Sequence, residues 1–205
     1  MKLIKVAAAT LNQTPLDWKN NLSNILGAIK EAKRHNASIL CLPELCITGY
    51  GCEDAFLSPG LHSMAIKLLN QIVPQTKGIL ISLGLPISHK NNLFNTACLV
   101  GEGKIFGFIP KRYLARSGIH YEPRWFKPWP LHEDVRVNVE GVNYPFGDLY
   151  FDCDGIRIAF EICEDAWVSE RPGGESILKG VDIILNPSAS HFAFQKQQIR
   201  ERFVL

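Results

Sequence analysis

Three residues with complementary chemistry, Glu44, Lys111 and Cys163, each follow a stretch of sequence that predicts a buried strand. A cysteine can attack a carbonyl carbon while a carboxylate takes the thiol proton and returns it to departing ammonia. A lysine ammonium, with the backbone N–H after the nucleophile, can stabilise the tetrahedral oxyanion. Water then cleaves the thioester, with the same carboxylate as base. The three side chains are therefore chemically complete for amide hydrolysis.

The segment around Cys163 predicts a sharp corner at the end of a strand. Asp154-Gly155 is a two-residue hairpin signal, and apolar residues alternate over 156–162 as in a strand that ends at the cysteine. The pattern then breaks, and Arg-Pro-Gly-Gly follows at 171–174. Nucleophile elbows lie at such corners, where backbone N–H groups can lower the pKa of a thiol and later hold an oxyanion. For a lone cysteine, a buried hydrophobic role is the more common alternative.

Strand ends place the other two residues as well. A strand at 38–42 is followed by Glu44, and a strand at 105–109 runs into Lys111, for which solvated surface charge is the ordinary interpretation. We expect all three side chains at one edge of a sheet. The histidines, at 35, 62, 89, 120, 132 and 191, include no close-spaced ligand pair, so a metal-activated water is an inferior explanation and we expect no metal.

Hydrophobic periodicity alternates between strands and helices along the chain. The pattern predicts a strand at 3–9, a helix at 17–35, a strand at 38–42, a helix at 61–72, strands at 78–85, 93–100 and 105–109, a helical turn at 176–179, a strand at 181–185 and a helix from 195. Gly101 to Lys104 predicts a hairpin turn and lacks the spacing of a phosphate-binding loop. The last helix would carry Ile199, Phe203 and Val204 on one face.

The segment at 115–145 has little periodicity. It is rich in proline, tryptophan, histidine and charge, which predicts a long structured loop that carries Glu122 and Trp125. Long loops of this kind often have functional roles. The strand at 181–185 opens onto another polar segment, 186–192.

The composition excludes several classes of protein. A chain of 205 residues with 46% hydrophobic and 20% charged residues is typical of one globular domain. The formal charge of +2 gives no bulk attraction to nucleic acid or to an anionic membrane, and no apolar run approaches membrane-spanning length. The 6 cysteines include no C-x-x-C pair, which indicates reduced thiols, so we expect a cytoplasmic protein.

Three short motifs together resemble the nitrilase, or carbon–nitrogen hydrolase, superfamily. They are Pro43-Glu44-Leu-Cys-Ile-Thr-Gly-Tyr50, Pro110-Lys111-Arg-Tyr-Leu and Glu161-Ile-Cys163-Glu-Asp-Ala-Trp167, in the order in which the family has them. The resemblance implies a four-layer α-β-β-α sandwich that usually pairs its sheets into homo-oligomers. It also implies a second glutamate beside the lysine, at Glu122, for which a loop salt bridge is the alternative.

Within this superfamily, Cys163-Glu164-Asp165 and Asn186-Pro-Ser-Ala-Ser190-His-Phe are similar to the glutaminase domain of glutamine-dependent NAD synthetases. The resemblance implies that Ser190 and Lys196 hold the amino-acid end of glutamine, since a hydroxyl can accept from its ammonium and a lysine can pair with its α-carboxylate. The implied substrate-binding residues are Tyr50, Ser117, Glu164, Trp167, Ser190 and Lys196. Ser117 departs from the pattern, because many relatives carry a tyrosine at that position.

Some of these residues also have ordinary structural interpretations. Ser190 could be the N-cap of a helix, and Lys196 a solvated lysine on that helix. Tyr50 and Trp167 could be aromatic core residues at strand ends. The resemblance favours substrate binding over these alternatives.

The resemblance also implies what the rest of the protein does. It predicts further strands and helices, so we expect residues 1–205 to be an incomplete glutaminase domain. The chain lacks a Ser-Gly-Gly-x-Asp-Ser pyrophosphate-binding loop. ATP and Mg²⁺ would therefore be used by a separate synthetase domain, while the glutaminase half needs no cofactor. Ammonia from glutamine would pass to that domain, which amidates adenylated deamido-NAD.

Two other functions stay open at this point. The first is a free-standing amidase or nitrilase that acts on a small ω-amide or nitrile. Lys196 distinguishes it from a glutaminase, because only a glutaminase would depend on this lysine for a preference for substrates that bear an α-carboxylate. The second is a catalytically inert nitrilase-like module used for assembly. The presence of Glu44, Lys111 and Cys163 together argues against the second, because packing alone does not require all three chemistries.

Overall fold

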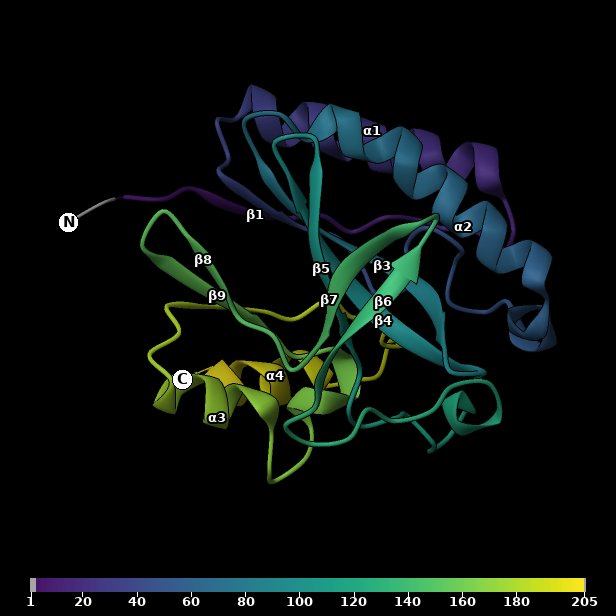
Figure 1. The fold of residues 1–205 in the computed structure, drawn as a ribbon. Coiled ribbons are helices and arrows are strands. Elements are labelled where there is room, and N and C mark those ends of the chain that lie inside the picture. The colour runs from purple at the N-terminus through teal and green to yellow at the C-terminus, as the bar shows by residue number, and fades with distance from the viewer. Residues whose placement is uncertain (1–2, 205) are drawn as a thin grey trace.

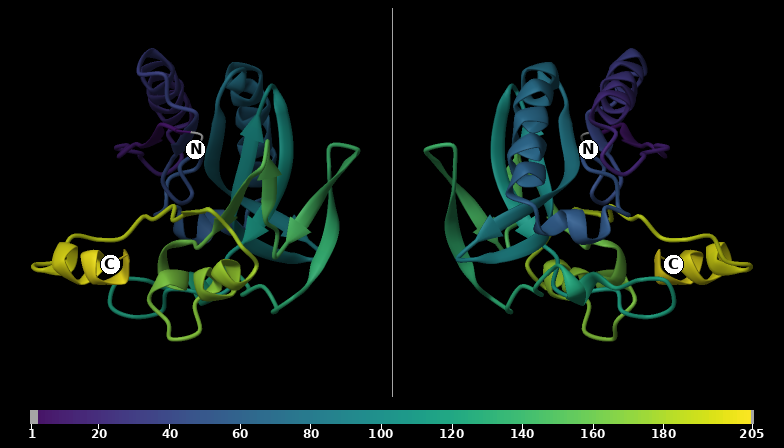
Figure 2. Two further views of the ribbon diagram at one scale, coloured as in Figure 1. Left: turned by 90° about the vertical axis from the view of Figure 1, so that its left-hand side faces the viewer. Right: turned by 90° about the vertical axis from the view of Figure 1, so that its right-hand side faces the viewer.

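The computed structural model describes residues 3–204 and arranges them in layers (Figure 1). Helices α1 (Trp18–Arg34) and α2 (Pro59–Ile72) cover the outer face of a seven-stranded sheet, and a three-stranded sheet packs against its inner face. Helix α3 (Pro172–Leu178) lies on the far side of the second sheet. Helix α4 (Lys196–Val204) projects from the body of the sandwich (Figure 2). The predicted α-β-β-α sandwich is confirmed.

The larger sheet has the strand order β1-β2-β3-β4-β5-β7-β6. Its strands are β1 (Val6–Ala8), β2 (Ile39–Cys41), β3 (Leu80–His89), β4 (Asn92–Gly101), β5 (Lys104–Pro110), β6 (Asp134–Val139) and β7 (Val142–Gly147). Strands β2 and β3 are parallel, while β4 is antiparallel to both β3 and β5. Strand β5 therefore runs in the same direction as β2, and the residues that follow these two strands emerge at the same edge of the sheet.

The smaller sheet has the order β10-β9-β8, with β8 (Phe151–Cys153), β9 (Ile156–Phe160) and β10 (Ile183–Leu185). Strands β9 and β10 are parallel, and β8 and β9 form the predicted hairpin. Buried apolar side chains from both sheets form the inner core, namely Ile39, Ala97, Leu99, Ile109, Ile158, Phe160, Ile162 and Leu185. Their burial holds the two sheets face to face.

Helix α1 shows why the outer layer forms where the sequence predicts it. The Asp17 side chain caps the helix by accepting from Asn20 N–H at 3.2 Å. Ile25, Ile29 and Ala32 are buried at helical spacing and join the core between the helices and the sheet. Capping and one apolar face therefore determine both the start and the orientation of this helix.

The prediction of a loop throughout 115–145 is wrong in its second half. Strands β6 and β7 form a hairpin there, joined by Glu140 and Gly141 with φ of 49° and 85°. Both turn residues are left-handed, as in a type I′ turn, although Glu-Gly is not its favoured sequence. Pro145, within β7, also obscured the strand pattern because proline cannot donate to a ladder. The first half of the segment does lack strands and contains the 3-10 helix Glu122–Arg124.

Other boundaries differ from the predictions by a few residues. Strand β1 is shorter than 3–9, and β9 ends at Phe160 instead of continuing to the cysteine. Helix α3 begins at Pro172, because proline is well suited to the first helical turn. On α4, Ile199 is 43% exposed, and the side chains of Phe203 and Val204 lie outside the described residues.

Short 3-10 helices connect several elements, at Glu53–Leu57, Val73–Thr76 and Cys163–Ala166 in addition to the one named above. They follow strands or extend helices where the chain changes direction. Across residues 3–204, no helix combines the length and the apolar character that crossing a membrane requires.

Candidate active site

The chain turns sharply at Cys163, the first residue of the 3-10 helix Cys163–Ala166. Its φ is 47°, in the left-handed region that non-glycine residues seldom adopt. Several hydrogen bonds hold this corner. Cys163 N–H donates to the Pro187 carbonyl at 3.0 Å, and Ile162 N–H donates to the Asp165 carboxylate at 2.8 Å. The strained backbone at this sharp turn matches the geometry expected of a nucleophile elbow, although the side chain of Cys163 is only 5% exposed.

Glu44 and Lys111 meet at the sheet edge where β2 and β5 end. Lys111 Nζ donates to Glu44 Oε1 at 2.7 Å, and both side chains are 0% exposed. Gly84, on β3, makes room for this arrangement, because a Cβ at that position would collide with the backbone N of Leu45. Lys111 is therefore a buried partner of Glu44 and not a solvated surface charge.

A second buried carboxylate, Glu122, binds the same lysine. One of its oxygens accepts from Lys111 Nζ at 2.8 Å and from the Tyr50 hydroxyl at 2.7 Å. The other oxygen accepts from Ala115 N–H at 2.8 Å. One ammonium group thus lies between two carboxylates, and we call Glu44, Lys111 and Glu122 the buried triad.

The charges of the buried triad shift the pKa values of its members and neighbours. Burial acts against the positive charge of Lys111, but Glu44 and Glu122 outweigh it and raise the lysine pKa. Burial, followed by the Glu44 charge, raises the pKa of Glu122 against the opposing effect of Lys111. The same two causes raise the pKa of Tyr50. At neutral pH the lysine is therefore charged and Tyr50 is a neutral donor.

Cys163 is a thiol in the resting protein. Burial, followed by the Glu44 charge, raises its pKa to about 12, while Lys111 and a hydrogen bond with Ser188 act in the opposite direction. The prediction that backbone N–H groups lower this pKa is wrong, because desolvation is the larger effect. The N–H of Cys163 itself is occupied by the Pro187 carbonyl. Any attack by this sulfur therefore requires a base to remove its proton.

Two further residues orient Glu44. Asn95 Nδ2 donates to Glu44 Oε1 at 2.7 Å, and Ala189 N–H donates to Oε2 at 3.0 Å. Neither residue is among those predicted from the sequence. Ala189 contributes only its backbone, which leaves no sequence signal, whereas Asn95 was recognisable as a polar residue within the buried, largely apolar strand β4.

Asp165 connects the cysteine corner with the segment that follows Lys111. Its carboxylate accepts from Arg112 N–H at 3.2 Å and from Tyr113 N–H at 2.7 Å. Burial raises the pKa of Asp165 to about 7.

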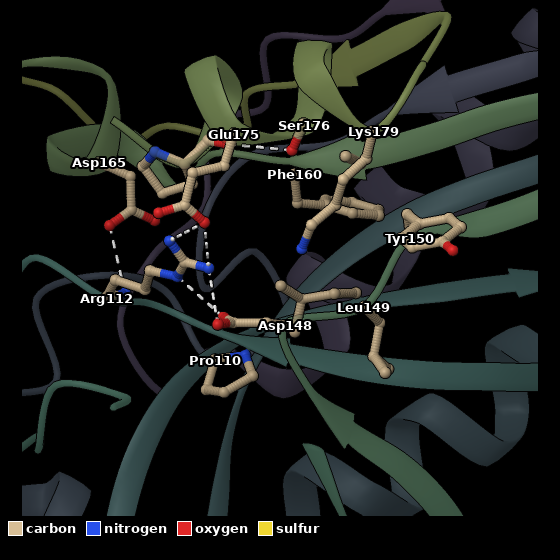
Figure 3. A pocket seen from close by; sticks show the side chains of 13 residues that line it. Pro110, Arg112, Asp148, Leu149, Tyr150, Phe160, Asp165, Glu175, Ser176 and Lys179 are labelled. Atoms are coloured by element: carbon tan, nitrogen blue, oxygen red, sulfur yellow. Dashed lines mark hydrogen bonds and ion pairs between the residues drawn. The ribbon is translucent and has the colours of Figure 1, made fainter. Parts of the chain in front are cut away.

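Figure 3 shows the Arg112 guanidinium between Asp148 and Glu175, at 2.8 and 3.2 Å. The cavity among these side chains is only about 30 Å³, so this ionic cluster supports the site and cannot admit a substrate.

Three of the predicted substrate-binding residues, Tyr50, Trp167 and Lys196, make side-chain contacts at two separate places. Tyr50 binds Glu122, as described above, and its hydroxyl lies 3.2 Å from His120 Nδ1. Lys196 Nζ lies 5.3 Å above the Trp167 ring. The structure thus places Tyr50 against the buried triad and pairs Lys196 with Trp167.

The other three differ in exposure. Ser190 is half-buried and comes directly after Ala189 in the chain. Glu164 is half-buried in the 3-10 helix Cys163–Ala166. Ser117 is exposed, and a hydrogen bond of 3.3 Å from a backbone N–H three residues later reaches its carbonyl. Ser117 is thus a surface turn residue outside the buried triad.

The two histidines nearest the site contact each other. His120 Nε2 lies 3.0 Å from His191 Nδ1. Burial, and then the proximity of His191, lower the pKa of His120. In the described part of the chain, no group of three or more His, Cys, Asp or Glu side chains could hold a metal ion.

A cavity of about 490 Å³ lies beside the cysteine corner, with Trp167, Ser188 and Arg200 among its lining residues. Ser188 is also close enough to Cys163 to act against the rise in the pKa of its thiol. Arg200 reaches the Ser188 hydroxyl at 3.4 Å. The volume is within the range of small-molecule sites.

Known proteins resemble this chain in both sequence and fold. The carbon–nitrogen hydrolase family profile matches residues 5–202. A glutamine-dependent NAD(+) synthetase of Arabidopsis thaliana is 35% identical over 211 residues, which cover 98% of this chain and 29% of that protein. One from Saccharomyces cerevisiae is 34% identical over 214 residues, which cover 99% of this chain and 30% of that protein. The chain thus spans about 30% of the length of these relatives.

Solved structures show the same relationship. The crystal structure of a glutamine-dependent NAD(+) synthetase from Cytophaga hutchinsonii matches with a TM-score of 0.90 and 47% identity, over 98% of this chain and 33% of that one. An amidase from Nesterenkonia sp. matches with a TM-score of 0.74 and 20% identity, over 95% of this chain and 68% of that one, a likeness of fold alone. With the family profile spanning nearly all residues, the chain belongs to the carbon–nitrogen hydrolase family.

Proposed function

We propose that this domain hydrolyses the side-chain amide of glutamine through a thioester on Cys163. The observation that carries the proposal is the buried triad, in which one lysine joins two carboxylates within electrostatic reach of an elbow cysteine. The names of the relatives support glutamine as the amide, because those proteins are glutamine-dependent. The proposed catalytic residues are Glu44, Lys111, Cys163 and Glu122.

The first half-reaction forms the thioester. Glu44 takes the proton of the Cys163 thiol as the sulfur attacks the amide carbon, and the carbonyl oxygen becomes an oxyanion that the Lys111 ammonium stabilises. Glu44 then gives the proton to the amide nitrogen, the C–N bond breaks, and ammonia leaves. The high pKa of the resting thiol makes this proton transfer to Glu44 a necessary step.

The second half-reaction releases glutamate. Water attacks the thioester carbon while Glu44 takes one of its protons, and the tetrahedral intermediate collapses by breaking the C–S bond. The departing sulfur recovers a proton from Glu44, which restores the resting thiol. Glu122 keeps Lys111 in position throughout, through its 2.8 Å contact with Nζ.

Recognition of the amino-acid end of glutamine is assigned to Ser190 and Lys196, with Tyr50, Glu164 and Trp167 as neighbouring wall residues. Lys196 Nζ donates to the His191 carbonyl at 3.3 Å, a weak contact that an α-carboxylate can replace. Ser117 is the weakest member of the set, because it is exposed on a turn.

The wider role follows from the relatives, of which this chain spans about 30%. We propose that ammonia made here passes to a separate synthetase domain that uses ATP and Mg²⁺ to amidate deamido-NAD. The glutaminase reaction itself uses only side chains of this domain. We further propose that the protein works in the cytoplasm as a homo-oligomer, as the family usually does.

The test uses the full-length gene product with glutamine labelled at its amide nitrogen. We expect glutamate release, label in NAD when deamido-NAD and ATP are supplied, and loss of both in Cys163→Ala. Cys153→Ala is the matched control, since this half-buried cysteine lies in the β8–β9 hairpin away from the buried triad. It should retain wild-type rates.

Lys196→Ala separates the proposal from its alternatives. If glutamine is the substrate, this variant loses its preference for amides that bear an α-carboxylate. An unchanged preference, or equal turnover of simple ω-amides by the wild type, would indicate a free-standing amidase. A wild-type protein that turns over no amide, and whose Cys163 resists alkylation at every pH, would indicate an inert module.

A further inference from the structure

Asn95 occupies an unusual position for an amide side chain. It lies on strand β4, is 1% exposed, and donates from Nδ2 to Glu44 Oε1 at 2.7 Å. An ionised carboxylate only accepts hydrogen bonds, so the amide must present its nitrogen to Glu44. The other amide atom, Oδ1, is then buried without a hydrogen-bond partner among the described residues.

This arrangement is unfavourable for folding. A buried acceptor without a donor has lost its water and gained nothing in return, whereas an apolar side chain of the same shape has no such cost. Asn95 is therefore a poor choice for the stability of β4. Its benefit must come from the one hydrogen bond that the side chain makes within residues 3–204, which is the bond with Glu44.

Asn95 contacts both members of the Glu44–Lys111 pair. Its side chain binds the carboxylate, and its backbone carbonyl accepts from Lys111 N–H at 2.8 Å. Among the described residues, Glu44 Oε1 thereby receives two donors, Asn95 Nδ2 and Lys111 Nζ, while Oε2 receives only Ala189 N–H. A carboxylate oxygen can accept two hydrogen bonds, so Oε2 retains a free lone pair.

We infer that Asn95 is a positioning residue that fixes the carboxylate of Glu44, with Oε1 occupied and Oε2 available for proton transfer. The inference rests on the proposed amide hydrolysis. Without the Asn95 donor, Glu44 can rotate about its side-chain bonds, and Oε2 no longer meets the proton that it must take. The loss then appears in the chemical step and not in substrate binding.

The test compares Asn95→Leu and Asn95→Ala in the full-length protein. Both remove the donor, and leucine also keeps the branched shape of the side chain. The matched control is Thr96→Val, on the next residue of β4, which removes a buried hydrogen bond of 2.7 Å to the Leu85 carbonyl. Each variant is measured for kcat and KM of glutamine turnover and for thermal unfolding.

We expect kcat of Asn95→Leu to fall on the order of 10²-fold, with KM within about twofold of wild type and an unfolding temperature equal to or above it. Thr96→Val should show the opposite pattern, with a lower unfolding temperature and an unchanged kcat.

Two results would overturn the inference. One is a kcat that stays at the wild-type value in both Asn95 variants. The other is an unfolding temperature that falls in both variants as far as in Thr96→Val, which would make Asn95 a structural residue. If the wild type itself turns over no amide, the proposed function fails first, and that outcome is distinct from either of these.

Discussion

Lys111 Nζ lies 2.7 Å from Glu44 Oε1, and neither side chain is exposed to solvent. A buried ion pair is weak support for stability, but removal of one partner leaves a charge that neither water nor a counter-ion can satisfy. Here the lysine also neutralises part of the charge of Glu122. The buried triad therefore depends on Lys111 for folding as well as for the proposed chemistry.

Lys111→Met should lower the free energy of unfolding by about 3–5 kcal/mol, because two carboxylates lose their shared counter-ion in a buried site. Urea denaturation measures the effect, and glutamine turnover should be lost in the same variant. Lys104→Met is the control, since this lysine is exposed at the start of β5. A loss below about 1 kcal/mol in Lys111→Met would show that the pair behaves as if it were at the surface.

Alkylation of Cys163 should become fast only at alkaline pH, since burial and Glu44 raise the thiol pKa to about 12. Glu44→Gln should shift the alkylation profile to lower pH, because it removes the charge that opposes the thiolate. Lys111→Met should shift the profile in the other direction. Mass spectrometry of the labelled peptide follows this one cysteine among the 6 in the chain. Rapid alkylation of the wild type below neutral pH would contradict the burial argument.

Gly84→Ala should reduce both stability and turnover, because the new methyl group would meet the backbone N of Leu45 and displace the adjoining Glu44. The free energy of unfolding should fall by about 1–3 kcal/mol, as in other overpacked sites. Gly27→Ala is the matched control. Gly27 lies within α1 with nothing within 4 Å of its added Cβ, so this variant should gain about 0.5–1 kcal/mol. Equal effects of the two substitutions would show that the close approach at Gly84 is unimportant.

Asp165 should make stability depend on pH. Its folded-state pKa is raised by burial from 3.8 to about 7, so between these values the folded protein holds a proton that the unfolded chain has lost. This contribution to stability is greatest below about pH 4 and declines as the pH rises through about 7. Asp165→Asn lacks the titration, so its stability relative to wild type should increase from about pH 5 to about pH 8. A constant difference in the free energy of unfolding over this interval would show that Asp165 does not titrate there.

The sequence predicted those parts of the fold that local patterns specify. The apolar residues at helical spacing, among them Ile25 and Ile29, predicted α1, and Asp154-Gly155 predicted the β8–β9 hairpin. The three strand ends that carry Glu44, Lys111 and Cys163 were likewise visible as apolar runs followed by polar residues. The expectation of one sheet edge is wrong for Cys163, which follows β9 of the smaller sheet, while Glu44 and Lys111 follow strands of the larger one. Their chemistry could be inferred from the amino-acid sequence alone because it depends on residue types.

Tertiary contacts decided what the sequence could not. The high pKa of Cys163 depends on its burial and on Glu44, which is far away in the chain, and not on the turn that contains the cysteine. Asn95 lies on β4, whereas its partner Glu44 follows β2, on the other side of β3 in the sheet. The neighbours of Asn95 in sequence therefore give no indication of this contact. The β6–β7 hairpin was missed because a proline and an unfavoured turn sequence weakened a pattern that pairing with β5 completes.

The segment after β10 holds both reacting groups by its backbone. The Pro187 carbonyl accepts from Cys163 N–H, and Ala189 N–H donates to Glu44 Oε2, each at 3.0 Å. The number of residues from 187 to 189 therefore sets the distance between the carboxylate of Glu44 and the backbone of Cys163. Side-chain substitutions at 187–189 leave this distance unchanged. Insertion or deletion of a single residue there would alter the separation of Glu44 and Cys163, although neither residue is itself changed.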